Sequence, residues 1–220
     1  MRVLAVDTTT PRGSLAVVSG DTVEVEVHVT TPNGHSRWLV SAVDLALCGL
    51  GLEPGDLDGF AVTVGPGSFT GLRVGMSSVQ GLALATGRPC LGLPSLDVLA
   101  TSAVGQAPSI VALVDAARGE VFGGVYDEGG RLRGDRRAGR VADLVQGIDE
   151  EVAFVGDGAL RYRAEIEALV VGAVFPEVNL FLAADLGRQA VEPLRAGKGG
   201  PPGDLRPLYL RAAHIRKPKR

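Results

Sequence analysis

The chain of 220 residues carries 22 Lys and Arg against 25 Asp and Glu, so its formal net charge is −3, and 45% of its residues are hydrophobic. This balance excludes an overall positive field that attracts nucleic acid, and the length suits one large domain or two small ones. No apolar run is long enough to cross a bilayer, and the start is unlike a signal peptide, so we expect a cytoplasmic protein with no membrane partner. Two cysteines are too few for a disulfide framework.

The first half alternates predicted strands and helices. RVLAVD is a short apolar run that ends in Asp7, as a buried strand does, and SLAVVSGDTVEVEV supplies two more strands around a Gly20-Asp21 turn. Ser95 is expected to cap a helix that ends near residue 103. The remaining elements predicted here are a helix over 36–50, a strand over 59–65, a helix over 71–86 and a short strand in PCLGLPS.

The opening pattern then returns. SIVALVDAARGEVFGGVYDEGGRL (109–132) repeats the order of strand, aspartate, Arg-Gly turn, strand and Gly turn seen at the start. Two such units, with Asp7 and Asp115 in corresponding places, indicate an internal duplication with a cleft between the halves. We therefore predict an N-terminal lobe of residues 1–104 plus about 204–220, and a C-terminal lobe of 105–203. Helices near 141–147, 159–171 and 180–195 and a strand over 153–158 complete the second half.

The glycine loop VGPGSFTGLRVG (64–75) resembles a phosphate-binding loop. A Walker loop needs a lysine, and the chain has none between residues 1 and 197; the spacing also misses the last glycine of GxGxxG. A phosphate at the following helix N-terminus stays physically possible. The structural interpretation, in which the glycines allow a sharp turn and close helix packing, is the stronger one.

Several residues together outline a nucleotide cleft. Aspartates at two strand ends can hold a hydrated Mg²⁺ or initiate Asx turns, and the adjoining hydroxyls can donate to phosphate or satisfy the turn. A Gly-Asp pair after the later strand can leave room for adenosine or end that strand. These residues are Asp7, Thr8, Thr9, Asp115, Gly156 and Asp157, with Arg12 and Arg118 as the nearby cations. The three histidines form no HxxxH or HExxH pair, so no metal site is predicted.

The two helices of the first half carry more apolar surface than one sheet face requires. In helix 36–50, Leu39, Val43, Leu47 and Leu50 form one stripe, and Trp38, Ala42 and Leu45 form another. Helix 71–86 has a small-residue face through Gly71 and Gly75 and a second, larger face. The second stripes favour a partner surface. The face expected there contains Trp38, Ala42, Leu45, Leu72, Met76, Val79 and Ala83, with Gly71 and Gly75 packing inward.

These segments carry a resemblance. AVDTTTPRGSLAVV, HSRWLV, GPGSFTGLRVG, LVDAARGEVFGGVY and the closing PLYLR resemble the bacterial TsaB (YeaZ-type) family over nearly the whole chain. The resemblance implies an actin-like (ASKHA, ribonuclease H-like) duplicated α/β fold with two lobes of mixed sheets flanked by helices. It also implies a role in making N6-threonylcarbamoyladenosine at position 37 of tRNAs that read ANN codons.

In that pathway TsaB is the non-catalytic, dimerising partner of TsaD, the metal- and substrate-binding transferase, and an ATPase, TsaE, joins them. The resemblance thus implies no catalytic residue and no tightly bound cofactor in this chain, with ATP and metal bound by the partner subunits. It also implies a homodimer when the chain is alone and tRNA binding through the complex. Where the catalytic relative has HxxxH, this chain has His35 and Leu39.

Two alternatives remain open. One is a phosphotransferase of the same fold, such as a small-molecule kinase, which the missing lysines disfavour. The other is a glycopeptidase-like hydrolase, for which the sequence supplies no nucleophile or metal site. The basic tail HIRKPKR (214–220) can contact RNA or an acidic partner, or can simply be a solvated terminus.

Overall fold

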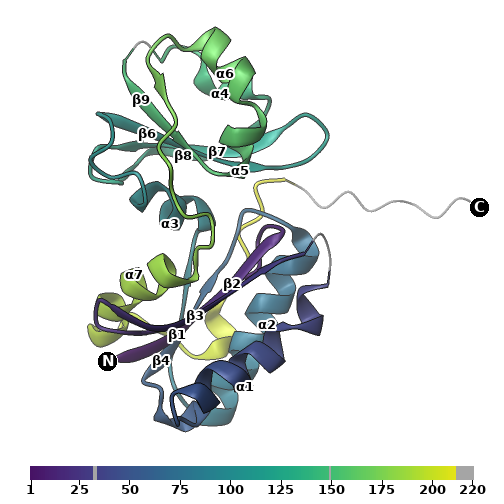
Figure 1. Ribbon diagram of the computed structural model, residues 1–220, viewed down its shortest axis with the longest axis vertical. Helices are drawn as coiled ribbons and strands as arrows, with labels where there is room; N and C mark the ends of the chain where they lie inside the picture. Colours follow the sequence, from purple (N-terminus) through teal and green to yellow (C-terminus); the bar gives the residue numbers. More distant parts are fainter. Residues whose placement is uncertain (32–33, 149, 212–220) are drawn as a thin grey trace, which may run out of the picture.

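The computed structural model describes residues 1–31, 34–148 and 150–211, which form two lobes stacked along the long axis of the molecule (Figure 1). The first lobe is built on a five-stranded sheet in the order β3-β2-β1-β4-β5. β1, β2 and β3 form an antiparallel meander, whereas β4 and β5 run parallel to β1. The strands are β1 (Arg2–Asp7), β2 (Arg12–Ser19), β3 (Thr22–Thr30), β4 (Gly59–Thr63) and β5 (Cys90–Leu93).

The second lobe repeats this sheet. Its order is β10-β9-β6-β7-β8, in which β6, β7 and β8 form the antiparallel meander and β9 and β10 extend the sheet in parallel. The strands are β6 (Ser109–Asp115), β7 (Val121–Asp127), β8 (Leu132–Gly139), β9 (Val152–Val155) and β10 (Ala173–Val174). The repeated pairing confirms the predicted duplication and the actin-like α/β fold with two mixed sheets.

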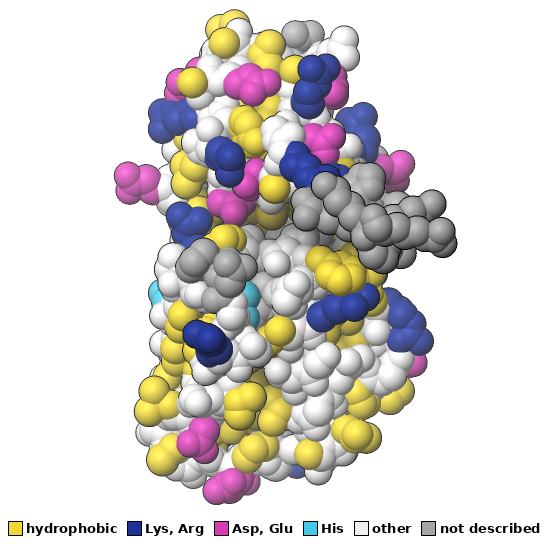
Figure 2. All heavy atoms as spheres, turned by 90° about the vertical axis from the view of Figure 1, so that its right-hand side faces the viewer, with side chains coloured by type: hydrophobic (Ala, Val, Ile, Leu, Met, Phe, Trp, Pro, Cys, Tyr) yellow, Lys and Arg dark blue, Asp and Glu magenta, His cyan; other side chains and the backbone are white. Residues whose placement is uncertain are grey.

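The side chains of each sheet alternate between two hydrophobic clusters. In β1, Leu4 and Val6 pack against α1 (Leu39–Gly49) and α2 (Phe69–Thr86), while Val3 and Ala5 face α7 (Ala183–Arg195) on the other side. The α1 and α2 side of the first lobe is turned toward the viewer in Figure 2. The first lobe also has 3-10 turns at His35–Arg37, Pro54–Asp56 and Pro202–Asp204, whereas α3 (Ser95–Thr101), which follows β5, packs on β6 and β7 of the second sheet.

The helices α3 and α7 lie between the two sheets and join the lobes through one continuous core. The outer face of the second sheet is covered by α4 (Val141–Val145), α5 (Asp157–Arg161) and α6 (Arg163–Leu169). The predicted cap at Ser95 is wrong. Ser95 is the first residue of α3, and its hydroxyl donates instead to the Pro66 carbonyl oxygen at 2.6 Å, which ties α3 to the glycine loop.

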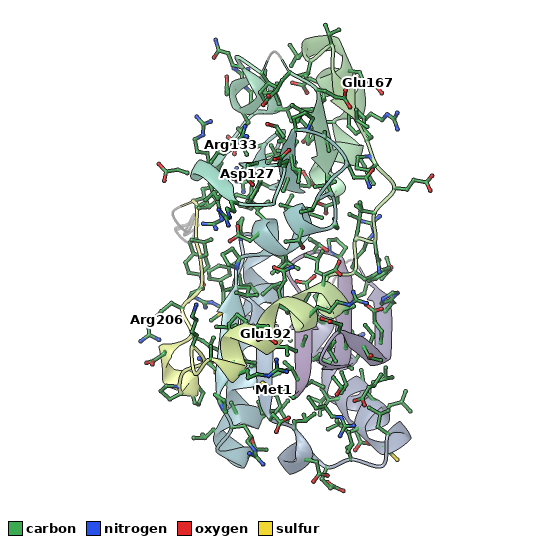
Figure 3. All side chains as sticks on the ribbon, turned by 90° about the vertical axis from the view of Figure 1, so that its left-hand side faces the viewer. Met1, Asp127, Arg133, Glu167, Glu192 and Arg206 are labelled. Atoms are coloured by element: carbon green, nitrogen blue, oxygen red, sulfur yellow. The ribbon has the colours of Figure 1, made fainter. Side chains whose placement is uncertain are left out.

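The helix α7 belongs to the first lobe. Figure 3 shows α7, marked by Glu192, lying across the strands near Met1. Its first N–H, at Ala183, donates to the Ser14 hydroxyl of β2 at 3.0 Å, and the chain after it pairs with Cys90 of β5. The predicted lobe boundary at residue 203 therefore moves back to about 182. The spacing of apolar residues predicts the helix, but it does not indicate which sheet the apolar face of the helix covers.

The last described segment, residues 205–211, crosses from one lobe to the other. The Leu208 N–H donates to the Val64 carbonyl oxygen of the first lobe at 2.7 Å. Arg211 forms an ion pair with Glu120 of the second lobe and donates to the Ala116 carbonyl oxygen at 3.4 Å. Within the described residues, no helix is both long enough and apolar enough to span a bilayer.

Candidate functional site

The end of β1 forms a buried polar turn. Asp7 is fully buried, and its Oδ1 accepts hydrogen bonds from the Thr9 N–H at 3.1 Å, the Thr9 hydroxyl at 2.6 Å and the Thr63 hydroxyl at 2.5 Å. Burial away from water raises the pKa of the Asp7 carboxyl, and the three hydrogen bonds oppose that shift. Asp7 thus initiates an Asx turn behind the cleft and is not one of the residues that line it.

The glycine loop between β4 and α2 packs directly on this turn. The Ser68 N–H donates to the Thr9 carbonyl oxygen at 2.7 Å, and the Thr8 hydroxyl donates to the Gly71 carbonyl oxygen at 2.8 Å. A Cβ on Gly71 would collide with the Thr8 carbonyl oxygen, and one on Gly67 would collide with that of Thr9. The loop glycines therefore permit a close backbone approach, in agreement with the structural interpretation of the motif.

The second lobe repeats the Asx turn. The Ala117 N–H donates to Asp115 Oδ1 at 3.2 Å, two residues along, just as at Asp7. The other carboxylate oxygen of Asp115 pairs with Arg161 at 2.8 Å. Asp157 Oδ1 accepts from the Asp115 N–H at 3.0 Å, and burial raises the pKa of the Asp157 carboxyl more than this bond lowers it. Asp115 thus forms a turn, and Asp157 ties the end of β6 to the start of α5.

A cleft of about 690 Å³ separates the lobes. Asp115 and Asp157 lie on its second-lobe side, and Thr9 and Ser68 lie on the first-lobe side. Most of the remaining wall is apolar: Pro11, Pro66, Phe69, Leu72, Val114, Phe122, Leu208 and Tyr209. Among the described residues, Arg211 is the one cation that lines the cleft, and its guanidinium is paired with Glu120. Neither Arg12 nor Arg118, expected as replacement cations, reaches the wall.

Phosphate binding in the cleft would depend on its cations and on its free backbone N–H groups. The phosphates need cations or free backbone N–H groups, yet the Ser68 N–H is bonded to Thr9 and the Gly71 N–H to the Ser68 hydroxyl. Gly156, at φ 108°, faces the Leu113 carbonyl oxygen where a Cβ would stand, so it serves the turn from β9 into α5. No group of three His, Cys, Asp or Glu residues that could hold a metal ion occurs in the described chain.

The histidine that begins the first helical segment is a local hydrogen-bonding group. His35 is buried, with its Nε2 3.0 Å from the Thr10 carbonyl oxygen, and its Nδ1 accepts from the Trp38 indole N–H at 3.1 Å. The indole can only donate, so Nδ1 carries the lone pair and Nε2 carries the hydrogen that Thr10 accepts. Both ring nitrogens are occupied, and neither is free for a metal.

The predicted partner face is largely core. Ala42 in α1 is buried, and in α2 so are Leu72, Met76, Val79 and Ala83, all within the cluster that packs on the first sheet. In α1 the stripe of Leu39, Val43 and Leu47 packs on the sheet, as expected. In α2 the stripe chosen for the partner is core, because a helical wheel does not say which apolar stripe meets the sheet. Gly71 and Gly75 do pack inward, with Gly75 against the Thr8 hydroxyl. Leu45 is exposed, as predicted, and Trp38 is half-buried.

The outward face of the two helices is apolar and nearly uncharged. Val40 and Leu45 of α1 are 70% and 67% exposed, and Leu84 of α2 is 77% exposed. Asp44 is the one charged residue of α1, and Arg73 is the one charged residue of α2. A groove of about 520 Å³ runs between the helices. In Figure 2 this face shows hydrophobic and uncharged side chains with few charges among them. The α1–α2 face is therefore a candidate protein-binding surface.

Sequence comparison identifies the family. The chain is 32% identical over 222 residues to the tRNA threonylcarbamoyladenosine biosynthesis protein TsaB of Escherichia coli, and the match covers 96% of this chain and 95% of that protein. The chain belongs to the TsaB family. A structure from Pseudomonas aeruginosa, described as similar to peptidase YeaZ, superposes with a TM-score of 0.81 at 28% identity, covering 96% of this chain and 99% of that one.

Two further matches relate this TsaB family member to other groups. Residues 29–174 match the family model described as TsaD: tRNA N6-adenosine threonylcarbamoyltransferase. The ADPNP-bound activator of 2-hydroxyisocaproyl-CoA dehydratase from Clostridium difficile superposes with a TM-score of 0.59 at 10% identity over 95% of this chain and 100% of that one. At that identity the likeness shows the fold alone. It supports the assignment of the TsaB chain to the actin-like class.

Three residues of the cleft wall have no sequence signal that predicts their place there. Phe122 lies at the start of β7, and Tyr209 and Arg211 come from the crossing segment. The motif PLYLR was noticed as part of the resemblance, but an extended segment gives no periodic signal that places it across a cleft. Thr63, which donates to Asp7, also has no distinctive signal, because it is the last residue of a buried and otherwise apolar strand.

Proposed function

We propose that this protein is the non-catalytic partner subunit of a TsaD-type transferase in the synthesis of N6-threonylcarbamoyladenosine at position 37 of tRNAs that read ANN codons. One observation carries the proposal: a TsaB family chain presents, on α1 and α2, an exposed apolar face that its own fold leaves uncovered. Burying such a face against a matching helix pair is favourable at roughly 25 cal/mol per Å² of apolar area.

The non-catalytic part of the proposal is supported by the chemistry of the cleft. Two carboxylates that an actin-like enzyme could use have internal partners: Asp7 Oδ1 accepts from Thr9 and Thr63, while its Oδ2 is buried away from the cleft, and Asp115 pairs with Arg161. His35 is held between Thr10 and Trp38. The chain therefore contributes structure to the complex, while ATP and metal belong to its partners and no cofactor is bound tightly here.

The proposed assembly is cytoplasmic, and one surface of this chain serves both of its protein contacts. The α1–α2 face binds TsaD in the complex and a second copy of this chain when TsaD is absent, in both cases through a four-helix contact closed by a two-fold or pseudo-two-fold axis. TsaE joins the pair that forms in this way. A symmetric contact of this kind needs a surface that is complementary to itself, and two nearly uncharged helices avoid like-charge repulsion across the axis.

The experiment is size-exclusion chromatography of the chain mixed with TsaD. Val40→Arg and Leu84→Arg place a charge in the proposed contact, and each is expected to make the two proteins elute separately. Val171→Arg is the matched control, because Val171 is fully exposed in the second lobe, away from both helices. Circular dichroism checks that all three variants stay folded.

A threonylcarbamoylation assay on an unmodified tRNA transcript completes the test. Omitting this chain, or replacing it with Leu84→Arg, is expected to abolish modification, while Val171→Arg sustains it. Folded Leu84→Arg that still co-elutes with TsaD at micromolar concentration would show that the contact lies elsewhere. Modification at the full rate without this chain would exclude the proposed role itself.

A further inference from the structure

The crossing segment, residues 205–211, is held by both lobes. Its middle is bound to the first lobe, where the Leu208 N–H donates to the Val64 carbonyl oxygen at 2.7 Å. Its end is bound to the second lobe, where Arg211 pairs with Glu120. Figure 1 shows the segment in yellow, running from one lobe to the other. The segment contains no helix or strand, so a few contacts determine whether it stays docked.

The contact with the second lobe is an ion pair with two supporting interactions. The Arg211 guanidinium also donates to the Ala116 carbonyl oxygen at 3.4 Å, and its central carbon lies 5.7 Å from the centroid of the Phe122 ring. The side chains of Arg211 and Glu120 are 28% and 39% exposed, so water weakens their attraction and the pair contributes modestly. A contact of this strength can be released without unfolding either lobe.

Between these two anchors, Tyr209 packs against the beginning of α2. The Tyr209 ring lies 5.6 Å from the Phe69 ring between centroids and is tilted by 30° relative to it. The guanidinium carbon of Arg73, one helical turn after Phe69, lies 3.9 Å from the centroid of the Phe69 ring. The Arg73 Nε–H donates to the Tyr209 hydroxyl at 3.3 Å. Tyr209 therefore restricts the positions of both α2 side chains.

Phe69 and Arg73 also belong to the α1–α2 face. Both line the groove between the two helices, and Phe69 lines the interlobe cleft as well. Arg73 is the one charged residue of α2, and the Phe69 ring is 46% exposed. Tyr209 lines the cleft but not the groove. The crossing segment thus positions an aromatic ring and a cation of the α1–α2 face from outside that face.

We propose that the crossing segment couples the contact between the lobes to partner binding at the α1–α2 face. While Arg211 is bound to the second lobe, Tyr209 holds Phe69 and Arg73 in the positions that the partner meets; release of Arg211 frees both side chains. The partner binds the docked state more tightly, because it does not have to immobilise those side chains itself. The inference rests on the proposed function for the identity of the face and adds what regulates its affinity.

Charge reversal across the ion pair tests the coupling. Glu120→Arg places two guanidinium groups side by side, although Glu120 lies in neither helix and does not line the groove. We expect it to weaken binding of TsaD to the full chain about threefold to tenfold in isothermal titration calorimetry. Adding Arg211→Glu rebuilds the pair with its charges exchanged and is expected to restore the affinity to within about twofold of the wild type.

Glu128→Arg is the matched control for the change of charge. Glu128 is exposed in the turn after β7 of the second lobe, and among the described residues its carboxylate has no partner. The variant carries the same change in net charge as Glu120→Arg but leaves Arg211 in place. It is expected to bind TsaD like the wild type.

Two further measurements test the path through the crossing segment. Tyr209→Ala is expected to weaken TsaD binding, and Glu120→Arg is expected to add little in that background, because both changes free the same two side chains. Hydrogen exchange of the full chain without TsaD measures release directly. The Leu208 amide, which its bond to Val64 protects, is expected to exchange faster in Glu120→Arg and at the wild-type rate once Arg211→Glu is added.

Three results would overturn the inference while leaving the proposed function intact, provided that Leu84→Arg abolishes TsaD binding. They are unchanged TsaD affinity in folded Glu120→Arg, an equal loss in Glu128→Arg, and additive effects of Glu120→Arg and Tyr209→Ala. If Glu120→Arg does not fold, Glu120→Gln replaces it and must weaken binding. If Leu84→Arg binds TsaD normally, the proposed face is wrong. Faster exchange at Leu208 in Glu120→Arg would then still support release of the segment, and unchanged exchange would overturn it.

Discussion

The hydroxyl of Thr8 donates a 2.8 Å hydrogen bond to the carbonyl oxygen of Gly71, and the carbonyl oxygen of Thr8 lies where a Cβ of Gly71 would stand. The two residues are 63 positions apart in the sequence. This pair fixes the start of α2 against the end of β1, and the contact leaves no room for a side chain on Gly71. The motif that resembles a phosphate loop therefore packs α2 against the end of β1. Its glycines are required because the two backbones are in direct contact.

Gly71→Ala is expected to destabilise the protein by about 1–3 kcal/mol, because the added methyl group must displace a backbone oxygen. Gly81→Ala in the same helix is the control. Gly81 has open space around it, and alanine there is expected to raise the free energy of unfolding by about 0.5–1 kcal/mol through better helix propensity. Urea denaturation of both variants measures the difference; equal effects at the two positions would contradict the packing role of Gly71.

Val79→Arg is expected to prevent folding. Val79 is completely buried against the first sheet, and an unpaired charge there costs several kcal/mol out of a total stability of about 5–15 kcal/mol. Leu84→Arg, five residues later on the exposed side of the same helix, is expected to fold normally. Circular dichroism and thermal melting compare the two; a native spectrum for Val79→Arg would show that this stripe of α2 is not core.

Asp7→Asn is expected to change how stability depends on pH. Burial holds the pKa of Asp7 above its ordinary value of 3.8, so between 3.8 and the raised value the folded protein keeps a proton that the unfolded chain releases. Wild-type stability relative to Asp7→Asn therefore falls as the pH rises through that window and is constant above it.

Urea denaturation of the wild type and Asp7→Asn at pH 4, 5, 6 and 7 measures this dependence, since asparagine keeps an oxygen for Thr9 and Thr63. A wild-type advantage that grows from pH 4 to pH 7 would show that the Asp7 carboxylate is stabilised by the fold. Transfer of the threonylcarbamoyl group by the whole complex is expected to follow folding alone; a folded Asp7→Asn that abolishes modification would reveal a catalytic role.

Mg·ATP is expected to bind weakly or not at all to the isolated chain. Arg211, the described cation on the cleft wall, is paired with Glu120, and two carboxylates face the same space and repel phosphates. Isothermal titration calorimetry measures binding directly. A dissociation constant in the micromolar range would contradict this expectation and favour a phosphotransferase of the same fold.

Strands and turns were predictable where short-range chemistry decides them. β1 and β6 are apolar runs that end in aspartate, and both aspartates form the Asx turns that their position suggested. β8 was missed because LRGDRRAG is a largely exposed edge strand, whose charged side chains carry no buried alternation.

Long-range relationships could not be predicted in this way. The sequence shows that α1 and α2 have two apolar stripes each, but the choice between core and exterior depends on the sheet that Leu4 and Phe60 help to form. The site depends on still more distant pairs: Tyr209 meets Phe69, and Arg211 meets Glu120, through an extended segment without periodicity.

The position of α7 determines the order in which the protein can fold during synthesis. The helix fills one face of the first sheet, yet it follows the entire second lobe in the chain. A ribosome therefore releases every strand of the second sheet before the first sheet can receive its covering helix. The second lobe can complete its outer core while the first sheet still exposes Val3, Ala5 and Val18. The lobe that is translated first is therefore the last to complete its folding.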